Sequence, residues 1–194
     1  MPTPAASQYP GRLVIISGPS GAGKSTIVRE LLDMCRVPLV LSVSATTRLP
    51  RPGEVHGVDY YFLTAEEFDR RRGAGEFLEC MDYAGNWYGT LQSEVNTRLA
   101  TGKWVLLEID VAGTLAVKAK HPEALTIFLH SGSIDELERR LRLRNTESEA
   151  ALQRRLEAAR RELAQRHEYK YEVINRDVPQ AVRDICEILV RHAQ

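Results

Sequence analysis

Gly18-Pro-Ser-Gly-Ala-Gly-Lys24-Ser25 is the stretch of this sequence that decides its fold. It has the GxxxxGK[ST] spacing of a phosphate-binding loop, directly after the apolar run of residues 13–16 and directly before a helical pattern. In such a loop, backbone N–H groups converge on phosphate oxygens, the lysine adds positive charge and the serine hydroxyl can ligate Mg²⁺. A glycine turn between a strand and a helix would explain the glycines, but not Lys24 and Ser25. The stretch therefore predicts a nucleoside triphosphate site made by Gly18, Ser20, Gly21, Ala22, Gly23, Lys24, Ser25 and Thr26.

Composition limits what the rest of the chain does. A length of 194 residues suits one α/β domain, and 26 basic against 26 acidic residues leave no overall field that would attract nucleic acid or a membrane. Three widely spaced cysteines indicate reduced thiols in a cytoplasmic protein. Residues 1–11 lack the features of a targeting signal and are interpreted as a flexible tail, and no run is long enough to span a membrane.

Short apolar runs alternate with helical patterns along the chain. The runs at 13–16, 39–43, 104–109, 125–129 and 173–174 have the length of strands buried on both faces. Serine or threonine followed three residues later by glutamate marks three helix starts, at Thr64, Ser133 and Thr146. The pattern predicts an α/β fold with a doubly wound parallel sheet in one domain, residues 12–194, whose core comprises 12–43 and 91–194.

Residues 44–90 interrupt this alternation and are predicted to form an inserted α+β lobe around a short helix that ends near Gly73. The lobe combines hydroxyls, guanidinium groups and aromatic rings, which are the components of a pocket for a phosphorylated aromatic ligand. An alternative is that Tyr60, Phe62 and Tyr83 only pack a small sheet.

Several motifs in order resemble the guanylate kinase family. They are Ser42-Val-Ser-Ala-Thr-Thr-Arg48-Leu-Pro-Arg51-Pro-Gly-Glu54, Gly57-Val-Asp-Tyr60-Tyr-Phe62, Glu76-Phe-Leu-Glu79, Gly85-Asn-Trp-Tyr88-Gly-Thr90, Leu107-Glu-Ile-Asp110 and Arg144-Asn-Thr-Glu147. The resemblance covers nearly all of the chain. It implies a core parallel sheet, a nucleoside-monophosphate lobe, a mobile lid at about 139–160, and Mg²⁺-dependent transfer of the ATP γ-phosphoryl group to GMP.

The resemblance also implies roles in the GMP lobe. Arg48 and Arg51, with Tyr60 and Tyr88, would grip the GMP phosphate, and the stiff segment around Pro50 suits two guanidinium groups that face one phosphate. Both arginines could instead be solvated surface residues. Arg51 is also placed with Lys24 among the catalytic residues, because charge neutralisation dominates phosphoryl transfer.

Base recognition is assigned to Glu79. An ionised carboxylate can accept the adjacent N1–H and amino donors of guanine, whereas it repels the N1 acceptor of adenine. In the resembling family Ser44 and Thr90 complete this site with hydroxyls, and Glu108 stands where aspartate is frequent, also near the base.

Two further positions have open alternatives. Asp110 follows the predicted strand at 104–109 and either orients Mg²⁺ waters, meets the GMP phosphate region, or simply caps the next helix. Asn175 matches a family position near the adenine of ATP, and a local backbone turn is the competing explanation.

The arginine-rich segment 139–166 is interleaved with glutamates and reads mostly as a solvated helix face rather than a nucleic-acid surface. By resemblance, Arg144 and Arg155 are lid arginines that close over the ATP phosphates as catalytic residues. The helix after Glu149 carries a leucine face that packs internally or against a second subunit, so a monomer and a homodimer both remain open.

Two alternatives to a guanylate kinase remain. One is a related kinase with another phosphorylated acceptor, such as a ribose bisphosphate, against which Glu79, Ser44 and Thr90 argue. The other is a noncatalytic guanylate-kinase-like binding module, against which the complete phosphate loop argues.

Overall fold

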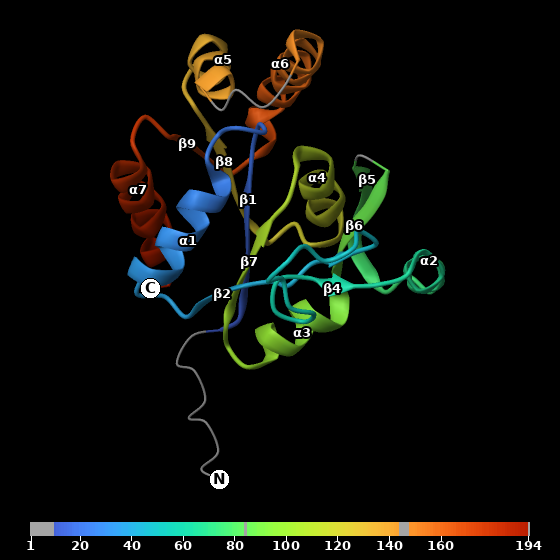
Figure 1. Ribbon diagram of the computed structural model, residues 1–194. Helices are drawn as coiled ribbons and strands as arrows, with labels where there is room; N and C mark the ends of the chain where they lie inside the picture. The colour runs from blue at the N-terminus through green and yellow to red at the C-terminus, as the bar shows by residue number, and fades with distance from the viewer. Residues whose placement is uncertain (1–9, 84, 144–147, 194) are drawn as a thin grey trace.

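The core of the protein is a five-stranded parallel sheet. The computed structural model describes residues 10–83, 85–143 and 148–193. The strands lie in the order β2-β7-β1-β8-β9, and all neighbours pair in parallel (Figure 1). This confirms the predicted α/β fold. The strand bounds are β1 (Arg12–Ser17), β2 (Leu39–Leu41), β7 (Trp104–Glu108), β8 (Leu125–His130) and β9 (Tyr171–Ile174).

The second strand is shorter than predicted. It ends at Leu41 rather than at residue 43, although the backbone N–H of Ser42 still donates to the carbonyl of Leu106 at 2.9 Å. Beyond that bond the chain leaves the core sheet for the inserted lobe. The last two residues of the predicted run, Ser42 and Val43, therefore lie outside the strand, because the connection to the lobe begins there.

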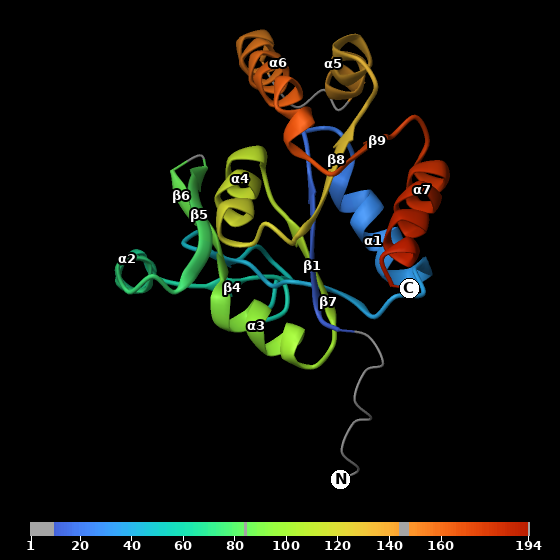
Figure 2. The ribbon, with the colours of Figure 1, turned by 180° about the vertical axis from the view of Figure 1, so that it is seen from behind.

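Helices cover both faces of the core sheet. Alternate residues of β1 point to opposite faces, so Val14 and Ile16 belong to one buried cluster and Leu13 and Ile15 to the other. The first cluster is covered by α1 (Lys24–Met34) and α7 (Val178–Arg191). The second is covered by α3 (Gln92–Ala100) and α4 (Val111–Lys120), on the opposite side of the sheet (Figure 2). This arrangement brings the starts of α1 and α4 to the carboxyl end of the strands.

A second, four-stranded sheet of order β4-β3-β6-β5 lies within the segment predicted as an inserted lobe. Its small core is built by Phe68, which stacks on Phe77 at 4.4 Å between ring centroids. Tyr83 is exposed and Tyr60 is half-buried, so neither ring belongs to that core. The elements are β3 (Ala45–Thr46), β4 (Tyr61–Phe62), α2 (Ala65–Gly73), β5 (Phe77–Tyr83) and β6 (Asn86–Leu91).

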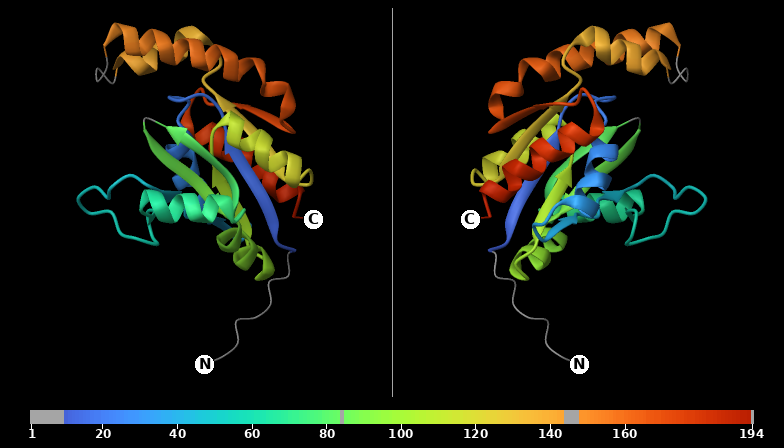
Figure 3. Two further views of the ribbon diagram at one scale, coloured as in Figure 1. Left: turned by 90° about the vertical axis from the view of Figure 1, so that its right-hand side faces the viewer. Right: turned by 90° about the vertical axis from the view of Figure 1, so that its left-hand side faces the viewer.

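Two helices form a separate layer above the carboxyl end of the core strands (Figure 3). They are α5 (Ile134–Leu143) and α6 (Glu149–Ala164), followed by the short helix η1 (Arg166–Glu168). Leu152, Leu156 and Ala159 of α6 pack against α5. The leucine face of α6 is therefore covered inside the chain.

The predicted helix starts are only partly observed. Thr64 and Ser133 accept hydrogen bonds from the backbone N–H groups of Glu67 and Glu136. For α6 the N-cap is Ser148, which accepts from the backbone N–H of Ala151. Thr146 lies outside the described residues, as do residues 1–9 of the predicted tail. None of the helices in the described ranges is long and apolar enough to cross a membrane.

Candidate active site

The phosphate-binding loop joins β1 to α1. Gly18 has a φ of 140°, and a Cβ atom there would lie 1.9 Å from the carbonyl oxygen of Leu129, so only glycine fits. The Lys24 ammonium donates to the carbonyl oxygens of Gly18 at 2.6 Å and Pro19 at 3.1 Å. Burial lowers the pKa of Lys24, partly offset by Glu108, Glu162 and Asp110. The loop thus holds a partly desolvated positive charge at its mouth.

Ser25, at the start of α1, contacts the end of the neighbouring strand β7. Its hydroxyl donates to Glu108 Oε1 at 2.6 Å. Strands β1 and β7 pair directly, and Ile16 lies opposite Glu108, so the sheet register sets this contact. Glu108 is therefore at the phosphate loop, next to the predicted Mg²⁺ ligand.

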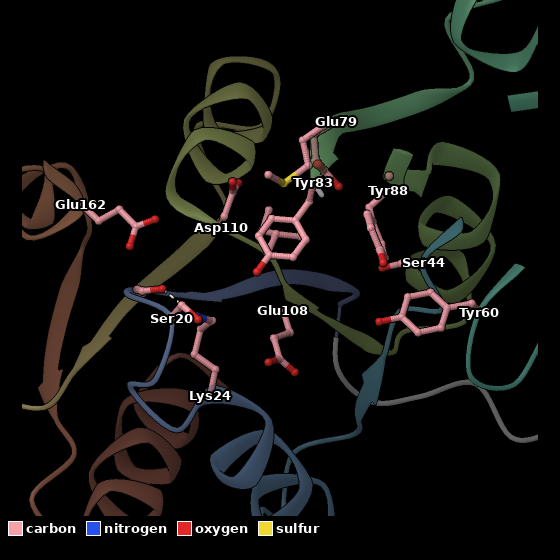
Figure 4. A pocket seen from close by; sticks show the side chains of 14 residues that line it. Ser20, Lys24, Ser44, Tyr60, Glu79, Tyr83, Tyr88, Glu108, Asp110 and Glu162 are labelled. Carbon is pink, nitrogen blue, oxygen red and sulfur yellow. Dashed lines mark hydrogen bonds between the residues drawn. The ribbon is translucent and has the colours of Figure 1, made fainter. Parts of the chain in front are cut away.

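A cavity of about 530 Å³ opens between the phosphate loop, β7 and the second sheet. Figure 4 shows its labelled side chains pointing inward from different elements, with Lys24 and Ser20 at one side, Tyr60 and Ser44 at another, and Glu79 above. An adjoining cavity of about 200 Å³ shares Ser44, Tyr60, Glu108 and Ile109 with it and adds others. Between them the two cavities collect eleven of the predicted residues: Gly18, Ser20, Lys24, Ser25, Ser44, Tyr60, Glu79, Tyr88, Thr90, Glu108 and Asp110.

Glu79 is a buried carboxylate in the wall of the larger cavity. It is 8% exposed, and its Oε1 atom accepts a hydrogen bond from the Thr90 hydroxyl at 2.7 Å. The two residues face each other across the antiparallel pair β5 and β6. Burial raises the pKa of Glu79, the bond from Thr90 lowers it, and nearby Asp110 raises it further. Thr90 therefore fixes one oxygen of a carboxylate that sits in an unfavourable environment for its charge.

Asp110 caps α4 beside Glu79. Its Oδ1 atom accepts from the backbone N–H of Gly113 at 2.7 Å, so the helix-capping alternative describes its position. A Cβ atom at Gly113 would lie 3.0 Å from Asp110 Oδ1 and 3.1 Å from Glu79 Oε2. Both carboxylates therefore flank this glycine and line the same cavity.

Arg48 is held in place by four neighbours. Its guanidinium lies over the rings of Tyr60 and Phe62, with 5.4 Å and 5.8 Å to the ring centroids. It donates to the Leu49 carbonyl at 2.7 Å and forms a 2.9 Å ion pair with Glu54. The guanidinium therefore stands beside the aromatic wall of the cavity in a defined orientation.

The structure brings the side chains of Tyr60 and Tyr88 to the cavity, but not that of Arg51. Tyr60 and Tyr88 contact each other edge to face at 6.1 Å and both line the larger cavity. The backbone N–H of Arg51 donates to Glu54 at 2.7 Å, but its exposed side chain lines neither cavity. Arg48 and the two tyrosines are thus assembled, whereas Arg51 is near them only through its backbone.

Helix α6, in the predicted lid, contacts the phosphate loop. Arg155 Nη2 donates to the Ser20 hydroxyl at 2.7 Å. Glu162, seven residues further along α6, lines the cavity (Figure 4), and its pKa is raised by burial and partly lowered by Lys24. Arg144 lies outside the described residues.

Asn175 is buried behind the phosphate loop. It is 3% exposed, and its Nδ2 atom donates to the carbonyl oxygen of Ala22 at 2.8 Å. A Cβ atom at Gly23 would lie 2.5 Å from Nδ2, which explains the glycine. The amide of Asn175 supports the loop through this bond, and its place near the adenine of ATP stays a prediction. Thr26, on the first turn of α1, is exposed.

Sequence reasoning missed Glu54 and Glu162. Glu54 follows Arg51 by three residues, a spacing that indicates a turn closed by a carboxylate. Glu162 belongs to the interleaved segment 139–166, whose pattern predicts a solvated helix face. Its spacing of seven from Arg155 places both on one face of a helix, which was the available signal.

The described side chains of this site do not by themselves form a metal-binding site. Among the described residues, no group of three or more histidine, cysteine, aspartate or glutamate side chains is placed to hold a metal ion. The hydroxyl of Ser25 and the carboxylate of Glu108 are oxygen ligands of the kind Mg²⁺ takes together with phosphates and water. The residues present therefore fit a metal ion that arrives with a nucleotide.

The model of guanylate kinases matches residues 10–192. The chain belongs to the guanylate kinase family. Guanylate kinases of Rhodopirellula baltica and Rubrobacter xylanophilus are 59% and 51% identical to it. These alignments cover 94% and 93% of this chain and 88% and 94% of the relatives.

A solved structure agrees with the family assignment. The crystal structure of guanylate kinase from Anaplasma phagocytophilum superposes with a TM-score of 0.76 at 30% identity, covering 98% of this chain and 90% of that one. The guanylate kinase match favours the predicted function over a kinase of another phosphorylated acceptor and over a binding module.

Proposed function

We propose that this protein is an enzyme that transfers the γ-phosphoryl group of ATP to GMP and forms ADP and GDP, with Mg²⁺ as cofactor. The observation that carries the proposal is the single cavity with Lys24 and Ser20 on one wall and Glu79, fixed by Thr90, on another. One wall suits a triphosphate and the other suits a guanine. A cavity of this kind brings donor and acceptor together without a covalent intermediate.

The donor side is the phosphate loop. Backbone N–H groups at the start of α1 and the Lys24 ammonium face the ATP phosphates. When ATP binds, Lys24 exchanges its bonds to the loop carbonyls for bonds to phosphate oxygens. Asn175 keeps the loop in shape from behind through its bond to Ala22, so we assign it a positioning role.

The acceptor base is read by carboxylates. Glu79 accepts the N1–H and amino donors of guanine, and its bond from Thr90 orients it for that task. Asp110 is next to Glu79 on the same cavity wall, which supports a role for Asp110 at the base rather than at the metal. Ser44 adds a hydroxyl from the same cavity.

The acceptor phosphate is held by Arg48, Tyr60 and Tyr88, with Arg51 joining from the exposed loop. Glu54 keeps Arg48 oriented and closes the loop at Arg51. The GMP phosphate is already ionised and needs no strong general base, so this side of the site works by alignment and charge neutralisation.

Glu108 and Ser25 are the residues that would hold Mg²⁺. Their 2.6 Å contact supports placing Glu108 at the metal, in contrast to its predicted place near the base. When bound, Mg²⁺ neutralises charge on the transferring phosphoryl group. Arg155, delivered by α6 to the loop at Ser20, adds positive charge from the lid, and we propose the same role for Arg144.

We infer that the enzyme acts on free nucleotides in the cytoplasm, in purine nucleotide metabolism, as a monomer or a homodimer. Its net charge of zero supports small-molecule substrates over nucleic acid or a membrane. The internal packing of the α6 leucine face favours the monomer.

An acceptor panel tests the function. ADP release is measured with ATP and, in turn, GMP, dGMP, AMP, dTMP and a ribose bisphosphate, first with Mg²⁺ and then with excess chelator. We expect selective turnover of GMP, weaker turnover of dGMP, and none without the metal. Equal turnover of AMP, or turnover of the sugar phosphate alone, would reject the proposal.

A further inference from the structure

The fold brings together two cysteines that are far apart in the sequence. Cys35 caps the carboxyl end of α1, and Cys186 lies in α7. These helices lie side by side on one face of the core sheet (Figures 1 and 2), and both cysteines pack against the same buried cluster. Their thiols are in hydrogen-bonding contact with each other. Neither takes part in the cavity that holds the candidate active site.

The surroundings make the two thiols unequal. The sulfur of Cys35 accepts from the thiol of Cys186 and from the backbone at Val37 and Arg36, and these bonds lower the pKa of Cys35 to about 6. The pKa of Cys186 is raised, because its proton is held in the bond to Cys35 and its site is partly desolvated. Both side chains are only partly buried, so a small oxidant can reach them. A thiolate next to a second thiol is the arrangement of an attacking and a resolving cysteine.

The third cysteine provides an internal comparison. Cys80 lies on β5 in the second sheet, away from the other two, and burial is the main cause that raises its pKa. It is also half-exposed and free. A difference in reactivity between Cys80 and the pair therefore reports pairing rather than exposure.

We propose that Cys35 and Cys186 form a reversible disulfide that ties α1 to α7. With a peroxide as the oxidant, the Cys35 thiolate attacks one peroxide oxygen, the O–O bond breaks, and after protonation Cys35 sulfenic acid and one water result. The Cys186 sulfur then attacks the Cys35 sulfur, and the hydroxyl leaves with a proton as a second water. Two thiols lose two electrons in total, and the peroxide takes them up. A dithiol reductant returns both thiols.

The disulfide would change the stability of the protein rather than the rate of phosphoryl transfer. It joins the end of α1 that points away from the phosphate loop to the last helix of the chain, so it closes most of the chain into one loop. The two thiols interact across the packed helices, and a disulfide would require their sulfurs to close to about 2.05 Å. Because α1 ends at Met34 and Cys35 has extended backbone angles, the shift falls outside the helix.

The test uses the full chain treated with hydrogen peroxide, then quenched and denatured. Free thiols are counted with a maleimide, and peptides are mapped by mass spectrometry without reduction. We expect the free thiols to fall from three to one, a linked peptide pair that contains Cys35 and Cys186, and recovery of three thiols with dithiothreitol. The oxidised protein should melt about 5–10 °C higher.

Matched variants make the result specific. After peroxide treatment, the Cys80→Ser variant should contain no free thiol and should still show the rise in melting temperature. The Cys35→Ser and Cys186→Ser variants should form no internal disulfide. Three free thiols after peroxide, sulfinic acid at Cys35 without a link, or a link through Cys80 would overturn the proposal. The mass readout is independent of kinase activity, so it stands apart from the test of the proposed function.

Discussion

Replacing Glu79 by glutamine separates recognition from folding. The side chain keeps its shape, and its amide oxygen can still accept the 2.7 Å bond from Thr90. Its NH₂ group then faces the donors of guanine, so one charge-assisted hydrogen bond is lost and two donors oppose each other. A hydrogen bond to a charged group contributes about 1.5–3 kcal/mol, and an unsatisfied partner adds to the loss. We expect kcat/KM for GMP to fall by about 10²–10³, since about 1.4 kcal/mol corresponds to a factor of ten.

The same substitution should not weaken the fold. Burial raises the pKa of Glu79, which means that its ionised form is disfavoured in the folded protein. A carboxyl with a raised folded-state pKa makes the fold less stable at neutral pH and more stable as the pH falls through that pKa. Glutamine removes this cost, so we expect a melting temperature for Glu79→Gln at neutral pH that is no lower than that of the wild type.

The assay compares kcat/KM for GMP and AMP between pH 5 and 8. Activity of the wild type with GMP should fall as the pH drops through the raised pKa of Glu79, because the protonated carboxyl accepts only one donor. This acid limb should be absent in Glu79→Gln. Glu76→Gln is the matched control, because Glu76 forms partly exposed ion pairs with Arg70 and Arg71. A GMP to AMP preference in Glu79→Gln within twofold of the wild type would refute the reasoning.

Three other substitutions test the remaining walls of the site. Arg155→Ala removes the lid contact with Ser20 and should lower kcat by about 10²–10³ while calorimetry finds GMP affinity within twofold. Glu108→Gln should raise the Mg²⁺ concentration for half-maximal rate about tenfold, because one carboxylate charge is lost beside Ser25. Asn175→Ala leaves a carbonyl of the phosphate loop without its partner, so it should lower the melting temperature by about 2–6 °C and raise KM for ATP more than KM for GMP.

For each of these three substitutions, one outcome would contradict the prediction. Arg154→Ala, which changes an exposed arginine of the same helix, serves as the control for Arg155. Equal losses of GMP affinity and kcat in Arg155→Ala would contradict a role at the donor phosphates. An unchanged Mg²⁺ dependence in Glu108→Gln would return Glu108 to the base site, and equal changes of both KM values in Asn175→Ala would argue against support of the loop.

Much of the fold was predictable because local patterns and the fold agree. The strand, phosphate loop and helix at residues 12–34 form as predicted, since three glycines with positive φ allow the turn and buried apolar residues flank it. The second sheet was predictable as an insertion, because its aromatic residues follow no core pattern. The end of β2 was not, since apolar Val43 follows Ser42 where the chain already turns away from the core sheet.

The residues of the site were predictable from the sequence, but the contacts between them were less predictable. Glu79 and Thr90 meet because they face each other across a hairpin, which the spacing suggests. Glu108, at the end of β7, meets Ser25 in the helix that follows the neighbouring strand β1, and no local spacing encodes that contact. Asn175 reaches Ala22 from the far end of the chain. The pairing of Cys35 with Cys186 depends in the same way on the packing of two helices distant in sequence.

Gly113 lies between two carboxylates that line the larger cavity. A methyl group there would press on Asp110 and Glu79 together, although the glycine itself carries no group that a nucleotide could recognise. The positions of both carboxylates are consequently tied to the backbone of α4, because any side chain at residue 113 would have to displace them by a few tenths of an ångström. An attempt to change which bases the protein accepts could therefore begin with substitutions at Gly113 instead of at the carboxylates themselves.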